Sequence, residues 1–126
     1  MRIIKQTYQV DAPIKSVWKA LVDPQYIEGW GGGPAKISDE VGTSFKLWGG
    51  DIYGKNLEVV SEKRLVQEWR EGDWDKPSKV TFTLKEKDGG TQIELLHEDV
   101  PDEEAKDIDR GWNEYYLGAI KKYFEE

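Results

Sequence analysis

The chain has 126 residues with no cysteine and one histidine, and 25 acidic against 18 basic side chains give it a net charge of −7. The composition excludes disulfides, thiolate metal sites and cysteine nucleophiles, and a lone histidine cannot build a zinc site. The acidic balance argues against nucleic acid as a partner, because such binding rests on neutralising phosphates. We therefore expect no metal, no cofactor and no bound nucleic acid.

The length fits one domain covering residues 1–126. No apolar run approaches the ~18 residues that predict a membrane-spanning helix. Residues 1–5 enter an alternating pattern at once and lack the apolar stretch of a signal peptide, so we expect a cytoplasmic protein.

Residues 2–10 alternate and predict a strand, which two short helices follow. Asp11, just before Pro13, is a candidate cap for the first helix, whose apolar residues recur at helical spacing. That helix ends at Asp23, because the residue before a proline disfavours helix. Asp23 then caps a second helix over residues 24–29, and the glycines of residues 30–34 predict a flexible break.

The apolar period changes to two after residue 36, which predicts a run of antiparallel strands. The expected strands are 43–48, 51–61, 64–71, 79–85 and 91–98. Gly49-Gly50 and Gly89-Gly90 are typical of tight hairpin turns, and Pro101 ends the sheet.

A long helix is predicted from about Asp102 to Phe124, with large apolar residues three or four apart on one face. That face comprises Ala105, Ile108, Trp112, Tyr116, Ala119 and Tyr123. Gly111 and Gly118 lie inside the helix, where each glycine costs about 1 kcal/mol relative to alanine. Their common side predicts a close approach of backbone or ligand.

This order of elements predicts an α+β fold, in which a curved antiparallel sheet wraps around the long C-terminal helix. We expect the first strand at or near one edge of the sheet. A helix laid on the concave side of a curled sheet leaves a tapering gap, and small-molecule sites tend to occur in such gaps.

The element order resembles the helix-grip fold of the START-like, or SRPBCC, superfamily. A closer resemblance is carried by Ala12–Pro24, by Gly50–Gly54 through Leu65–Arg70 and Trp74, and by Gly89–Thr91, Val100-Pro101 and Gly111–Phe124. Together they are similar to the C-terminal domain of activators of the heat-shock protein 90 ATPase. The resemblance implies a chaperone as one partner. Those activators also use a separate N-terminal domain to contact the chaperone, for which this chain has no room, so we expect weak ATPase stimulation.

Aromatic side chains from different elements are the strongest candidates for a site, because they are expected to meet around the gap. The predicted cavity residues are Trp30, Trp48, Trp69, Phe82, Leu95, His97, Trp112 and Tyr116. They predict binding of a small apolar or aromatic ligand. The alternative is that the rings simply fill the gap.

Two kinds of polar residue offer acid–base chemistry. His97 is interpreted either as a general base or polar anchor, or as a hydrogen-bonded structural residue, and the lack of a surrounding nucleophile motif favours structure. Glu58 and Glu68 are interpreted as buried acids or as partners of Arg64 and Arg70, and the ion pairs are favoured.

Three hypotheses follow in order of preference. The first is a non-catalytic module that binds a small ligand, and the second is a chaperone co-factor or other protein regulator. The third is a cyclase-like or hydrolase-like enzyme that uses His97 or a buried glutamate.

Overall fold

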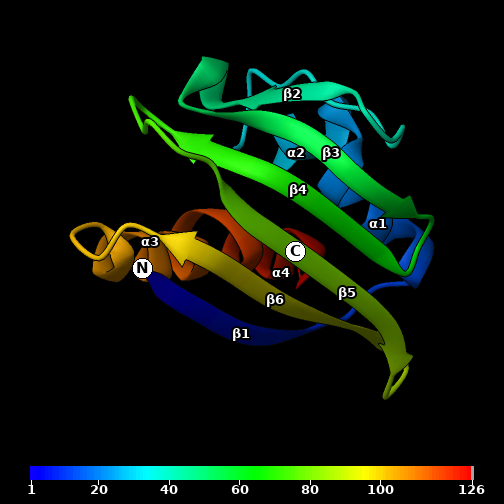
Figure 1. The fold of residues 1–126 in the computed structure, drawn as a ribbon. Coiled ribbons are helices and arrows are strands. Elements are labelled where there is room, and N and C mark those ends of the chain that lie inside the picture. The colour runs from blue at the N-terminus through cyan, green and yellow to red at the C-terminus, as the bar shows by residue number, and fades with distance from the viewer. Residues whose placement is uncertain (126) are drawn as a thin grey trace.

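The computed structural model describes residues 1–125 and contains a six-stranded antiparallel sheet (Figure 1). The strands are β1 (Arg2–Val10), β2 (Ser44–Leu47), β3 (Ile52–Val60), β4 (Arg64–Glu71), β5 (Ser78–Lys87) and β6 (Gly90–Val100). Their order across the sheet is β1-β6-β5-β4-β3-β2, so β1 lies at one edge and β2 at the other. The predicted antiparallel sheet with the first strand at an edge is confirmed.

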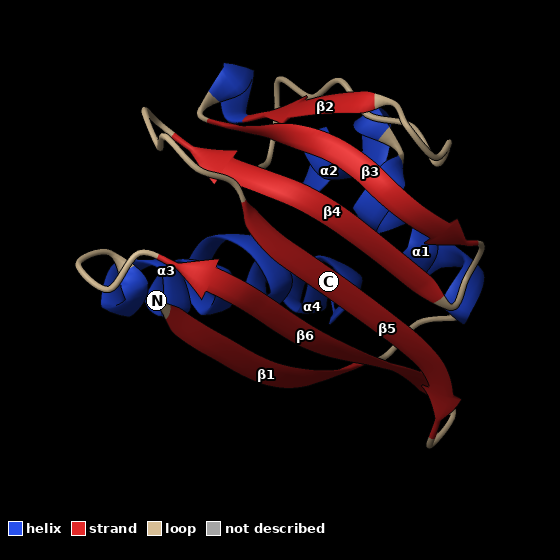
Figure 2. Ribbon diagram, in the orientation of Figure 1, coloured by secondary structure: helices blue, strands red, loops and turns tan. Residues whose placement is uncertain are grey.

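The helices form two groups that lie on the same side of the sheet (Figure 2). The first group is α1 (Ile14–Val22) and α2 (Pro24–Trp30), between β1 and β2 in the chain. The second group runs as one long helix through α3 (Ala105–Gly111), the π-helical turn η2 (Trp112–Tyr116) and α4 (Leu117–Glu125). Within residues 1–125, no helix has both the length and the apolarity needed to span a membrane.

The short helices begin differently. Asp23 caps α2 as predicted, since its carboxylate accepts a hydrogen bond of 2.9 Å from the backbone N–H of Gln25. The predicted cap at Asp11 is wrong. The residue preceding α1 is Pro13, and among the described residues no side chain caps the first turn of that helix.

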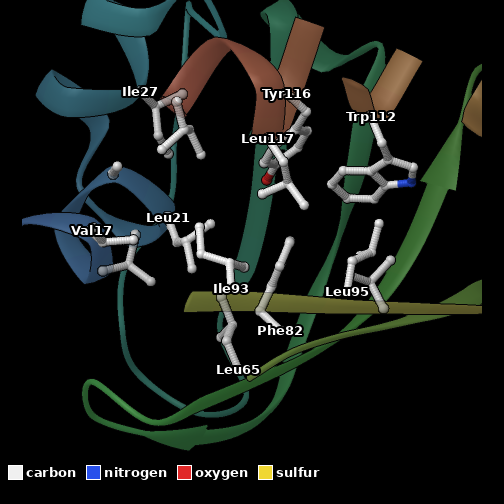
Figure 3. Packing of buried hydrophobic residues seen from close by; sticks show 14 of the residues in the cluster. Val17, Leu21, Ile27, Leu65, Phe82, Ile93, Leu95, Trp112, Tyr116 and Leu117 are labelled. Carbon is white, nitrogen blue, oxygen red and sulfur yellow. The ribbon is translucent and has the colours of Figure 1, made fainter. Parts of the chain in front are cut away.

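The core lies between the sheet and the two helix groups, as Figure 3 shows for part of it. Alternate residues of each strand point into this layer, because successive side chains of a strand face opposite sides. The fully buried members include Val17, Leu21, Ile27, Leu65, Phe82, Ile93, Leu117 and Ile120.

The apolar face of the long helix departs from the predicted stripe after Tyr116. Leu117 and Ile120 are completely buried, whereas Tyr123 is 36% exposed. In η2 the N–H of Leu117 bonds to the carbonyl of Trp112, five residues earlier, so this turn holds one extra residue. One extra residue rotates the following face by roughly 100°, so Ile120 takes the place that Ala119 would have in a regular α-helix and Phe124 takes that of Tyr123.

Candidate functional site

The predicted aromatic residues meet between the C-terminal helix and the sheet, around Tyr116 of η2. Its ring centroid lies 4.5 Å from that of Trp112, 4.9 Å from Trp30 and 5.7 Å from Trp48. Phe82 of β5 approaches Tyr116 from the sheet at 6.0 Å. Side chains from α2, the 3₁₀-helical turn η1 (Trp48–Gly50), β5 and η2 therefore form one ring cluster.

Trp112 extends this cluster toward the neighbouring strands. Its indole stacks on Trp69 of β4 at 5.5 Å with an interplanar angle of 26°. The ring of His97 of β6 is T-shaped to both tryptophans, with its centroid 5.6 Å from that of Trp112 and 4.7 Å from that of Trp69. Leu95, two residues before His97, is 3% exposed and lies near Trp112 in Figure 3. Side chains thus pack much of the space between helix and sheet.

A pocket of about 410 Å³ remains where η1 and the adjoining ends of β3 and β4 face α3 and η2. Its walls are Trp48, Asp51, Ile52, Trp69, Glu71, Asp107, Ile108, Arg110, Gly111, Trp112, Tyr115 and Tyr116. Trp48, Trp69, Trp112 and Tyr116 were among the predicted cavity residues. The pocket is not lined by the remaining predicted cavity residues, which are Trp30, Phe82, Leu95 and His97.

Trp48 forms one wall in an unusual backbone conformation. Its φ of 50° lies in the left-handed region, which a bulky side chain rarely adopts. Two hydrogen bonds hold the turn there, from the N–H of Trp48 to the Gly32 carbonyl (2.8 Å) and from Gly49 to the Pro34 carbonyl (3.0 Å). The glycine-rich segment is thereby tied to the pocket wall, and strained residues of this kind cluster at functional sites.

The helical wall follows from residue spacing. Ile108, Gly111, Trp112, Tyr115 and Tyr116 recur three or four residues apart, so they share one face of α3 and η2. A Cβ atom built on Gly111 meets no other atom within 4 Å. The lack of a side chain at Gly111 therefore leaves the pocket open, and Tyr115, which is 63% exposed, stands at its mouth.

A chain of buried hydrogen bonds lies behind this wall. The indole N–H of Trp112 donates to Nδ1 of His97 at 3.0 Å. Ser78 donates its hydroxyl proton to the carbonyl of Trp69 at 2.7 Å, so Nε2–H of His97 is the donor in its 2.8 Å bond to Ser78 Oγ. Each group has one defined role, and together they fix a neutral histidine in a single tautomer.

His97 is completely buried, and burial lowers its pKa from 6.5 to about 3. Both of its ring nitrogens are occupied by protein groups, and neither meets the pocket. The geometry favours the structural interpretation of this residue over the catalytic one.

The half-buried carboxylate of the pocket is Glu71, which was not among the residues predicted from the sequence. Burial raises the pKa of Glu71 first, and the nearby charges of Glu104, Asp51 and Asp107 raise it further. A signal for Glu71 was present, since it follows Trp69 by two residues and so shares its face of β4.

The glutamates that the sequence did single out lie away from this pocket. Glu58 forms an ion pair of 2.6 Å with Arg64, and both side chains are about half exposed, so the ion-pair alternative is confirmed for Glu58. Glu68 lies opposite Lys79 in the pairing of β4 with β5.

A curved antiparallel sheet that holds a long C-terminal helix, with a pocket between them, defines the helix-grip fold of the START-like superfamily, as the sequence predicted. The chain belongs to the family described as activator of Hsp90 ATPase homolog 1-like protein, whose model matches residues 11–125.

Among curated proteins, the chain is 28% identical over 123 residues to an uncharacterised protein of Schizosaccharomyces pombe. It is 24% identical over 123 residues to the human activator of 90 kDa heat shock protein ATPase homolog 1. Each match covers 96% of this chain but only 37% and 36% of those proteins, so the chain spans about a third of their length.

Among solved structures, an Hsp90 activator of Plasmodium falciparum is similar with a TM-score of 0.88 at 22% identity, covering 97% of this chain and 95% of that one. DynU16, described as a putative protein of the dynemicin biosynthetic locus, is similar with a TM-score of 0.84 at 23% identity, covering 98% of this chain and 47% of that one. At these identities the two structures bear on the fold.

Proposed function

We propose that the chain is a non-catalytic binding module of this family, and that its pocket takes a small ligand with an apolar or aromatic body. The observation that carries the proposal is the pocket of about 410 Å³, which has the size of many small-ligand sites. Its aromatic walls come from three elements and comprise Trp48, Trp69, Trp112, Tyr115 and Tyr116.

The buried polar groups around the pocket support a binding role. Trp69 and Tyr116 are only 2% and 3% exposed, yet neither the indole N–H nor the hydroxyl has a hydrogen-bond partner within residues 1–125. Burial also raises the pKa of the Tyr116 hydroxyl, which therefore stays protonated at neutral pH. A ligand would gain contact area from the rings, and a polar atom on it would find donors close by.

A titration with small aromatic and apolar compounds, followed by tryptophan fluorescence, tests this proposal. Three tryptophans line the pocket, so a bound compound is expected to change the emission saturably. Gly111→Leu is expected to abolish the response, because the new side chain enters the open space of the pocket. Lys106→Leu, on the exposed surface of α3 and outside the pocket, is the control that should bind normally.

If Lys106→Leu loses saturable binding as Gly111→Leu does, the cause is an altered helix and not a filled pocket. That result would count against the pocket as the binding site. A broad panel without any saturable response from the unmodified protein would remove the support for a binding module.

A chaperone co-factor is the second candidate, and membership of the family favours it. The human relative is named an activator of the 90 kDa heat shock protein ATPase, and the similar protein of Saccharomyces cerevisiae is named an Hsp90 co-chaperone. An ATPase assay with the chaperone of the same organism tests this role for the present chain.

A further inference from the structure

The charged side chains around the pocket are unbalanced. Asp51, Glu71 and Asp107 line it, and Arg110 is the one cation among its lining residues. Arg110 already has acidic partners, since it lies 3.3 Å from Asp107 and 4.0 Å from Glu114. Within residues 1–125, no ion pair involves Asp51 or Glu71. The pocket therefore holds two carboxylates that lack a cation.

Glu71 is the carboxylate best placed to recognise a ligand. It is half-buried beside Trp69, and the neighbouring acids Glu104, Asp51 and Asp107 make the local potential more negative. A positive charge placed in the pocket would relieve this repulsion and would be attracted more strongly than in open water, because the surroundings are partly desolvated.

The walls suit the same kind of ligand. Ring faces attract cations, and quaternary ammonium groups are recognised by aromatic cages. Trp48, Trp69, Trp112, Tyr115 and Tyr116 all border the space that Glu71 borders. Arg110 at the rim is expected to disfavour a second positive charge.

We propose that the pocket selects a ligand that carries one positive charge on an aromatic or apolar body, an amine or quaternary ammonium compound, with Glu71 as its counter-ion. This inference rests on the proposed function, because it names the chemical class of the ligand for the same pocket.

Three probes of similar size separate charge from shape. Phenyltrimethylammonium carries the positive charge, tert-butylbenzene is its neutral isostere, and benzoate is negative. Titration of the full chain, followed by tryptophan fluorescence and calorimetry, is expected to give a Kd about tenfold lower for phenyltrimethylammonium than for tert-butylbenzene. Benzoate is expected not to bind.

Glu71→Gln is the decisive variant. It keeps the shape of the side chain and removes a half-buried charge that its neighbours repel, so we expect it to fold. The Kd for phenyltrimethylammonium should rise about tenfold, while that for tert-butylbenzene should stay unchanged. Glu68→Gln changes the net charge equally from the opposite face of β4 and should alter neither Kd.

The outcomes distinguish the two proposals. If neither phenyltrimethylammonium nor tert-butylbenzene binds, the binding-module proposal fails. If tert-butylbenzene binds as tightly as phenyltrimethylammonium, or if Glu71→Gln leaves the binding of phenyltrimethylammonium unchanged, the binding-module proposal is retained. The inference that the pocket selects a positive charge is then overturned. An equal loss of affinity for phenyltrimethylammonium in Glu71→Gln and Glu68→Gln would show that the cation is attracted by the overall negative charge of the protein. That result would also overturn the inference.

Discussion

At the scale of single residues, the most constrained group is His97. Its hydrogen bonds to Trp112 and Ser78, together with that of Ser78 to the Trp69 carbonyl, link η2 to three strands through side chains. A tryptophan N–H can only donate, so Nδ1 of His97 has to keep its lone pair. Protonation of Nδ1 would direct its new N–H at the indole N–H of Trp112 and break the hydrogen bond between them.

The stability of the protein should therefore decrease as the pH falls below about 6.5. The unfolded chain takes up a proton on His97 near pH 6.5, whereas the folded chain resists it down to about pH 3. Above pH 6.5 both states are neutral and this group contributes no pH dependence. At pH 5 the loss should be about 2 kcal/mol relative to pH 8, measured as the free energy of unfolding in urea.

His97→Gln is the matched control, because an amide can accept from Trp112 and donate to Ser78 but does not titrate. Its unfolding free energy should lack most of this pH dependence. His97 is the only histidine of the chain, so no other imidazole obscures the comparison. Equal slopes in the two proteins between pH 5 and pH 7 would contradict the account.

The sequence predicted some of these residues and missed others for identifiable reasons. The alternation of Ile93, Leu95 and His97 correctly placed the histidine on the face that meets the long helix. Its partners were not predictable, because Ser78 fell outside the expected strand. Pairing between side chains 15 and 19 residues apart depends on strand register, which period-two patterns do not give.

At the scale of elements, the two glycines of the long helix have opposite surroundings. No backbone approaches Gly111, where a Cβ meets nothing within 4 Å, so of the two predicted causes a ligand in the pocket stays a prediction. At Gly118 an added Cβ would overlap the carbonyl oxygen of Asn113, five residues earlier in the same helix. Gly118 is thus required by the π-helical turn itself and not by a neighbouring strand or a ligand.

Alanine substitutions should consequently have opposite effects. Gly111→Ala is expected to stabilise the protein by about 0.5–1 kcal/mol, because alanine is the better helix former and the space is free. Gly118→Ala is expected to destabilise it by about 1–3 kcal/mol despite the same gain in propensity, because the turn has to deform. Urea denaturation of both variants measures the difference. A gain in stability for Gly118→Ala would show that the turn accommodates a side chain and would refute its assigned cause.

The positions of the elements were predicted better than their internal geometry. All six strands and both short helices occur where the alternating and helical patterns placed them, with ends shifted by a few residues. The π-helical turn was not predicted, because the apolar pattern of residues 105–123 fits a regular helix equally well. The error displaced the expected face only after Tyr116, so Trp112 and Tyr116 were still placed correctly.

At the scale of the whole molecule, the concave side of the sheet is divided between packing and a pocket. Rings occupy the middle of the helix–sheet interface, and the pocket lies beside α3 and η2, where Gly111 provides no side chain. The sequence predicted which aromatic residues would gather but not how far they would fill the gap. Filled volume depends on side-chain directions, which the spacing of residues along the chain does not determine.

The chaperone hypothesis also belongs to this scale, because it concerns contacts of a complete surface. The chain matches 36% of the human activator and so offers a fraction of the surface of that protein. Linked binding modules gain about 10²–10⁴ in avidity over a single one, so residues 1–126 assayed by themselves are expected to lack that gain. We expect this chain to stimulate the ATPase of its own organism's chaperone weakly, without saturation at concentrations where a longer activator saturates.

The assay is steady-state ATP hydrolysis by the chaperone over a wide range of added protein, with the chain alone as the background. Gly111→Leu should behave like the unmodified chain, because the substitution fills a pocket that we assign to a small ligand. Strong, saturable stimulation by the unmodified chain would make the chaperone the principal partner. Loss of that stimulation in Gly111→Leu would then place the chaperone contact at the mouth of the pocket, where the exposed ring of Tyr115 lies beside the substituted residue.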